Sequence, residues 1–205
     1  VLREPIESGQ ITISRAARQA EFPARFQLVA AMNPCPCGYH GHPTGQCQCT
    51  SEQVQRYKLR ISGPLLDRID MHVDVPSVSL QQLRKSNSNE ESSKQVAKRV
   101  NQARARQLER QQKSNSMLSN QELYEVCQLD SQCQTLLEQA SQRLGLSARA
   151  YHRILRLART IADIEQTDTI TTKILSEAIS YRRLDRQMNN YSNTAHSFNK
   201  TVIPI

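Results

Sequence analysis

A chain of 205 residues is long enough to bury a core and suits one or two domains. Its formal net charge of +8 favours an anionic partner, with nucleic acid the leading class, although a solvated basic surface would give the same balance. No apolar run approaches the ~18–20 residues of a membrane span, and we recognise no signal peptide, so we expect a cytoplasmic protein with no membrane partner.

The first third of the chain combines a helix end with two predicted strands. The segment LREPIESGQ closes near Gly9, which suits a turn or a helix C-cap. In ITISRA, apolar Ile11 and Ile13 alternate with polar residues, which predicts a half-buried strand of a hairpin. Residues 25–32, RFQLVAAM, are largely apolar and lie between two prolines, which predicts a strand buried on both faces, as in a parallel sheet.

A polar residue, Asn33, ends this apolar run. Asn is common in turns and Pro34 follows, so a turn residue is one interpretation. The other follows from the rule that open parallel sheets bind ligands beyond the carboxyl ends of their strands. An amide placed there could orient a water molecule or a phosphate oxygen.

Four of the six cysteines fall within fifteen residues, as two Cys-x-Cys pairs: Cys35 and Cys37, then Cys47 and Cys49. Four thiolates can form the tetrahedral set that a structural zinc ion prefers, although the usual pair spacing is about two to four residues. The glycines and prolines between the pairs suit a loop that folds back on itself. We predict a structural Zn²⁺ site, with free thiols or a redox or disulfide pair as the alternatives.

Two histidines of the same loop, His40 and His42, could replace a thiolate or could be solvated. Four thiolates leave no open position for water, which favours a structural role over catalysis by the metal. The remaining cysteines, Cys127 and Cys133, have no partner motif, and we predict that they are small buried hydrophobic residues.

Beyond the cysteine loop we predict a helix over residues 51–62 with Ser51 as its N-cap, a short helix at GPLL, and a second strand at Met71–Val75. Between these last two lies Arg68, in LLDRID. One interpretation of Arg68 is a local ion pair with one of its acidic neighbours. The other is an arginine finger, which needs a guanidinium aimed at the phosphate of a neighbouring subunit.

Composition changes at residues 86–93, a polar linker, and nearly everything after it has helical periodicity. Predicted helices follow the candidate caps Ser119 and Ser147, and another ends at Gly145. We therefore predict an all-helical domain over residues 94–185. The tail, residues 186–205, has no core pattern and is predicted to be disordered.

Three blocks are similar to the ComM/YifB family of magnesium-chelatase-like AAA+ ATPases: ISRAARQAEFPARFQLVAAMNPCPCGYHGH, SGPLLDRIDMHVDVP and GLSARAYHRILRLARTIADIE. The resemblance covers roughly residues 1–185. It implies an α/β plus all-α fold, with part of an AAA+ α/β core over residues 1–85 followed by a helical lid. It also implies a ring-forming, hexameric ATPase that uses ATP and Mg²⁺ and acts on DNA, as a branch-migration motor in natural transformation.

The same resemblance assigns roles to individual residues. Asn33 resembles the sensor 1 asparagine that positions the hydrolytic water, and Arg68 resembles the arginine finger. Arg149 resembles the sensor 2 arginine that contacts the nucleotide, where a solvated residue of the first helical turn is the alternative, and Arg153 is a further candidate on that helix.

The ITISRA hairpin occupies the place of a pore-facing insertion in related ring ATPases. Arg15 and Arg18 are therefore candidate DNA contacts, and an ordinary exposed basic hairpin is the alternative.

No G-x-x-x-x-G-K-[ST] segment and no apolar run ending in paired acids occur in this sequence. The resemblance thus implies the carboxyl-terminal part of a longer ATPase, inactive alone. Two other functions stay open: a non-enzymatic zinc-containing module that binds nucleic acid through the cysteine loop and the basic helix over residues 94–113, and a subunit of a magnesium-chelatase-type metal-insertion complex.

Overall fold

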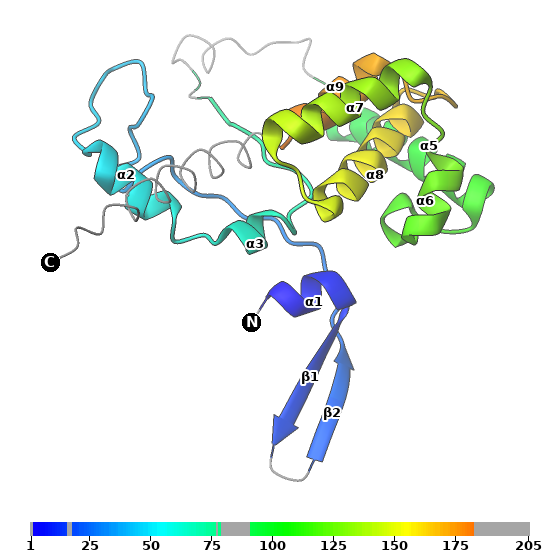
Figure 1. Cartoon of the computed structure of the whole chain (residues 1–205), viewed down its shortest axis with the longest axis horizontal. Helices are drawn as coiled ribbons and strands as arrows, with labels where there is room; N and C mark the ends of the chain where they lie inside the picture. The colour runs from blue at the N-terminus through cyan, green and yellow to red at the C-terminus, as the bar shows by residue number, and fades with distance from the viewer. Residues whose placement is uncertain (1, 16–17, 77, 79–90, 183–205) are drawn as a thin grey trace, which may run out of the picture. The chain divides into compact units, whose positions relative to one another are not determined.

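The computed structural model describes residues 2–15, 18–76, 78 and 91–182 (Figure 1). They fall into two compact units, one up to Ile69 and one from Asp70 onward. The described chain is mostly helical with one small antiparallel sheet, which agrees with the predicted α/β plus all-α class at that level. The predicted tail and most of the predicted linker lie outside the described residues.

The first unit begins with a short helix and a hairpin. Helix α1 (Arg3–Ser8) ends where Gly9 adopts a left-handed φ of 69° and donates its N–H to the Pro5 carbonyl, as a C-cap does. Strand β1 (Gln10–Arg15) pairs antiparallel with β2 (Arg18–Pro23). The predicted turn and hairpin are confirmed, but every side chain of β2 is exposed.

The predicted buried strand, residues 25–32, and the second predicted strand, Met71–Val75, are not strands in the described structure, so both predictions are wrong. A strand requires a neighbour that pairs with its N–H and C=O groups, and the sheet among the described residues contains only β1 and β2. Their apolar side chains are correspondingly uncovered: Val29 is 84% exposed and Val75 is 86% exposed.

Helix α2 (Ser51–Lys58) begins one residue earlier than predicted, because Thr50 and not Ser51 is its N-cap. The Thr50 hydroxyl accepts from the backbone N–H of Gln53, whose side chain accepts in turn from the Thr50 N–H. This reciprocal capping box satisfies two N–H groups that the first turn leaves without helical partners. The short helix α3 (Gly63–Leu66) confirms the prediction at GPLL.

The second unit is helical from Ser93 onward. Its elements are α5 (Ser93–Gln111), the 3₁₀ turn η1 (Asn115–Met117), α6 (Asn120–Val126), α7 (Ser131–Leu144), α8 (Ala148–Ile164) and α9 (Thr172–Ser180). The Ser119 and Ser147 hydroxyls cap α6 and α8 by accepting from backbone N–H groups, and α7 ends at Gly145. These three boundaries were predicted.

Helix α8 lies at the centre of this unit and contacts α5, η1, α6 and α9 (Figure 1). Its apolar face buries Ile154, Ala158 and Ala162, as the periodicity predicts. Cys127 and Cys133 are buried in the same core, and burial raises the pKa of each thiol to about 11, so both behave as the small hydrophobic residues predicted. Among the described helices, none has the length and apolar character to cross a bilayer.

Candidate functional site

The cysteine loop of the first unit begins with a tight turn. The Gly38 N–H donates to the Cys35 carbonyl (3.1 Å), and Gly38 has φ +83°, a left-handed conformation that residues with a Cβ rarely adopt. Pro36, between the two cysteines of the first pair, fixes another backbone angle. The turn directs both thiols of the first pair toward the second pair.

All four sulfur atoms, from Cys35, Cys37, Cys47 and Cys49, lie within 4.8 Å of one another. The Cys35 Sγ is 3.3 Å from Cys37 Sγ and 3.8 Å from Cys47 Sγ, and the Cys37–Cys47 distance is 3.6 Å. Cys35 is buried, whereas Cys37 is exposed. The fold thus gathers the four predicted ligands into one cluster that could hold a metal ion.

The thiols of this cluster do not titrate alike. The Tyr39 backbone N–H, followed by the Cys35 and Cys49 thiols, lowers the pKa of Cys37 to about 6. At Cys49 a hydrogen bond from the Cys37 backbone N–H favours the thiolate. The hydrogen bond with the Cys37 side chain and burial outweigh that effect, and they raise the pKa of Cys49 to about 12. One thiolate therefore forms easily, while a second beside it is disfavoured by like charge.

Neither predicted histidine alternative belongs to this cluster. His42 Nδ1 instead lies 2.7 Å from the Thr44 hydroxyl, and the His42 ring packs edge-on against Tyr39. His40 is an exposed residue of the loop.

Asn33 lies beside the cysteine turn. A Cβ built on Gly38 would be 3.8 Å from Asn33 Nδ2, so the amide packs across the face of that glycine. Asn33 itself is exposed, follows a segment without regular secondary structure, and is followed directly by a bend at Pro34 and Cys35. Both interpretations from the sequence, a turn residue and a ligand-facing amide, are compatible with this position.

Arg68 forms an ion pair, but with a partner distant in sequence. Its Nε and Nη2 donate to Glu7 Oε2 at 2.8 and 2.7 Å, and its Nη1 donates to the Pro64 carbonyl at 2.7 Å. The side chain is 17% exposed. The predicted local partners were Asp67 and Asp70; the observed carboxylate comes from α1 instead.

The candidate arginines of the second unit lie on α8. Arg149 is half-buried in the first turn, where the helix dipole favours an anion. Arg153, one turn later, forms an ion pair with Asp70, and its side chain is 13% exposed. Its buried Nε has no hydrogen-bond partner among the residues that the structure describes. Of the two, Arg149 lies nearer the N-terminus of the helix.

The candidate DNA contacts belong to the hairpin of the first unit. Arg15 at the end of β1 and Arg18 at the start of β2 are paired in register, and the Arg18 side chain is exposed. An exposed cation such as Arg18 is accessible to a phosphate backbone.

A buried polar network in the second unit was not predicted. The Asp163 carboxylate is fully buried and accepts hydrogen bonds from Arg110 (2.7 and 3.0 Å), Arg159 (3.2 Å) and Asn115 (2.9 Å). The sequence does hold a signal: Arg159 and Asp163 are four residues apart and share the face of α8 that buries Ala158 and Ala162. The network joins α5, η1 and α8.

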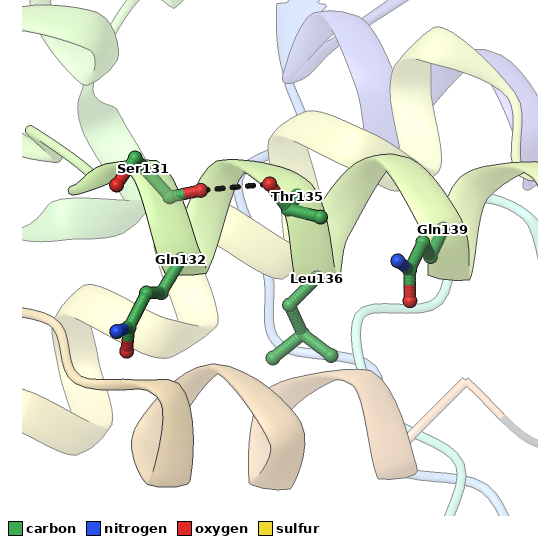
Figure 2. A pocket seen from close by; sticks show the side chains of 5 residues that line it. All are labelled: Ser131, Gln132, Thr135, Leu136 and Gln139. Carbon is green, nitrogen blue, oxygen red and sulfur yellow. Dashed lines mark hydrogen bonds between the residues drawn. The ribbon is translucent and has the colours of Figure 1, made fainter.

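A surface hollow on α7 is lined by hydroxyl, amide and apolar side chains (Figure 2): Ser131, Gln132, Thr135, Leu136 and Gln139. The Thr135 hydroxyl donates to the Ser131 carbonyl within the helix (2.9 Å). The lining contains no cation, so the hollow is not suited to the phosphates of a nucleotide.

Two family models match the chain almost end to end. The model described as magnesium chelatase, subunit ChlI, matches residues 1–83, and that of the ChlI C-terminal part matches residues 90–182. The uncharacterized protein YifB of Escherichia coli is 50% identical over 186 residues, which are 90% of this chain and 36% of YifB. The competence protein ComM of Haemophilus influenzae is 46% identical over 193 residues, 94% of this chain and 37% of ComM.

An uncharacterized protein of Mycobacterium tuberculosis is 34% identical over 186 residues, 89% of this chain. The chain spans little more than a third of the length of these relatives.

Proposed function

The chain belongs to the ComM/YifB family of magnesium-chelatase-like AAA+ proteins, and we propose that it is the part of a ring-forming, DNA-acting ATPase that completes the nucleotide site. The P-loop and the acidic Mg²⁺ ligands are absent from this sequence, and we place them in the remaining length of the protein. In this proposal the protein is a hexamer that uses ATP and Mg²⁺ to drive branch migration during recombination and natural transformation.

The position of Arg68 is the observation that carries the proposal. A guanidinium has five N–H donors, and the contacts with Glu7 and Pro64 use three of them. Within the described part of the chain, these contacts leave two donors to meet a phosphate while the side chain stays held in place. A finger fixed before the reaction stabilises the charge of the transition state without the cost of ordering a flexible side chain.

Two further residues complete the proposed site. We assign Asn33 to orienting the attacking water near the γ-phosphate, and Arg149 to binding the phosphates from the N-terminus of α8. Arg153, which is held by Asp70, is assigned a secondary role beside Arg149.

DNA is the proposed partner of the hairpin. Arg15 and Arg18 would contact phosphates, which supplies affinity and salt dependence without reading sequence. Arg18→Ala in the full-length protein should weaken DNA binding about equally for all sequences and reduce the slope of log affinity against log salt by about 1. Lys173→Ala removes an equal charge from the surface of α9 and should leave both quantities unchanged.

The activity itself is tested with the full-length protein. We expect ATP hydrolysis that requires Mg²⁺ and rises on addition of a branched DNA, together with ATP-dependent displacement of a labelled strand. A protein that assembles and binds ATP, yet hydrolyses it no faster with DNA than without, would contradict the assignment to a DNA motor.

A second candidate rests on the exposed cations of α5. Lys94, Lys98 and Arg104 are all exposed on this helix, as a nucleic-acid-binding module would require. Such a module would bind DNA tightly and with strong salt dependence as the 205-residue chain alone. The motor instead predicts weak binding by the chain alone, because the avidity of the ring is missing. Titration of fluorescent DNA at two salt concentrations separates the two functions.

A further inference from the structure

We propose that the four cysteines of the loop bind one zinc ion with all four thiolates, and that this ion fixes the turn against which Asn33 rests. The site is structural, since four thiolates leave no coordination position for water. The second part of the inference rests on the proposed function of Asn33, whereas the first does not.

The sulfur positions fit a single tetrahedral ion. A zinc–sulfur bond of about 2.3 Å places the sulfurs of a regular tetrahedron about 3.8 Å apart. The Cys35 sulfur lies 3.3 Å from that of Cys37 and 3.8 Å from that of Cys47, and the Cys37 and Cys47 sulfurs are 3.6 Å apart. All four sulfurs lie within 4.8 Å of one another. Only small shifts separate the loop from the ideal ligand set.

Other uses of the four thiols fit less well. A polynuclear iron–sulfur cluster gives its thiolates to different irons, which requires sulfurs spread further apart than these. A disulfide would join one pair and leave two thiols crowded against it, although the cluster is arranged as a set of four. A divalent cation also offsets the repulsion that opposes four neighbouring thiolates, and thiolate is the ligand that zinc prefers.

The metal site and Asn33 share one turn. Asn33 precedes Cys35 by two residues, and its amide packs across Gly38, whose N–H closes the turn on the Cys35 carbonyl. Two of the four ligands, Cys35 and Cys37, lie within that turn. Binding of the ion would therefore restrict the backbone on which the Asn33 amide depends, which makes the cysteines positioning residues.

The metal is tested first, by elemental analysis of the full-length protein purified without added metal. We expect one zinc per chain and loss of most of it in Cys47→Ser. His40→Ala, a change in the same loop, and Cys127→Ala, a change of a cysteine outside the loop, should both retain it. Replacing the metal of the unaltered protein with Co²⁺ should give the visible absorption of a tetrahedral thiolate site. Because this measurement uses no variant, it does not depend on whether a variant folds.

The coupling to Asn33 is tested by separating turnover from binding. In Cys47→Ser, kcat for ATP should fall about tenfold or more, while the affinity for a fluorescent ATP analogue and the assembly of the ring stay as in the unaltered protein. His40→Ala should keep full turnover. Unchanged kcat in a zinc-free variant, or a parallel loss of nucleotide binding, would overturn the positioning role.

The two parts can fail separately. A protein without zinc, or with iron in its place, overturns the metal site even if ATP is hydrolysed normally. A protein with one zinc per chain but no ATPase activity upholds the metal site and rejects the proposed function.

Discussion

Arg149 and Arg153 lie one turn apart on α8. Arg149 lies in the first turn of the helix, whereas Arg153 lies one turn further along and forms an ion pair with Asp70. An incoming anion would meet the N–H groups of the first turn together with the Arg149 guanidinium. Of the two, Arg149 is therefore better placed for nucleotide phosphates.

Arg149→Ala in the full-length protein should raise the KM for ATP by about ten- to a hundredfold, the equivalent of losing one charged hydrogen bond of about 1.5–3 kcal/mol. The kcat at saturating ATP should change much less, because the finger and the sensor asparagine remain. Steady-state kinetics measure both constants. A fall in kcat at constant KM would assign Arg149 to the transition state and not to binding.

At the scale of elements, the buried Asp163 network holds α5, η1 and α8 together. Its carboxylate accepts from two arginines and one asparagine, so the charge is paired and hydrogen-bonded on several sides. Removal of the carboxylate leaves the arginine charges buried without a compensating negative charge. This costs more than the loss of an exposed ion pair.

Asp163→Asn should destabilise the helical unit by about 3–5 kcal/mol. The matched control is Asp168→Asn, which breaks the ion pair with Arg106 at a side chain that is 93% exposed and should cost at most about 1 kcal/mol. Urea unfolding followed by circular dichroism gives both values. Equal effects of the two substitutions would show that the network contributes no more than a surface pair.

The same carboxylate makes stability depend on pH. Burial alone would raise the pKa of Asp163, but hydrogen bonds from Arg110 and Asn115 and the charge of Arg159 hold it below its usual range. Because the folded pKa lies below the unfolded value of about 3.9, this contribution is fully present above that value and is lost as the pH falls through the folded pKa. Unfolding at a series of pH values should show a loss of stability below about pH 4 that is smaller in Asp163→Asn.

At the scale of the whole chain, features set by neighbouring residues were predictable. The hairpin, the glycine that ends α1, the serine caps and the apolar face of α8 all follow from local spacing. The cysteine cluster was predictable for the same reason, since its two pairs are close in sequence.

Features that depend on distant partners were not predictable. Residues 25–32 have the composition of a buried strand but no strand partner among the described residues, so composition alone could not fix their structure. The Glu7 partner of Arg68 and the Arg110 partner of Asp163 lie more than fifty positions away along the chain. No local pattern distinguishes them from other acidic and basic residues.

The central proposal is that each nucleotide site uses Asn33 from one subunit and Arg68 from its neighbour. Asn33→Ala and Arg68→Ala should each abolish most ATP hydrolysis, the latter by about 10³–10⁵-fold, with ATP binding and assembly retained. Arg68→Ala should cost little stability, at most about 1 kcal/mol, because its partner Glu7 is 40% exposed.

The most direct test mixes the two inactive full-length variants in equal amounts, allows the subunits to exchange, and measures ATP hydrolysis. In a ring of head-to-tail interfaces, about a quarter of the interfaces then join an intact Asn33 to an intact Arg68. We expect the mixture to recover about a quarter of the unaltered rate, if each interface acts independently. Exchange without any recovery would contradict the shared site, because residues that act within one subunit cannot complement each other.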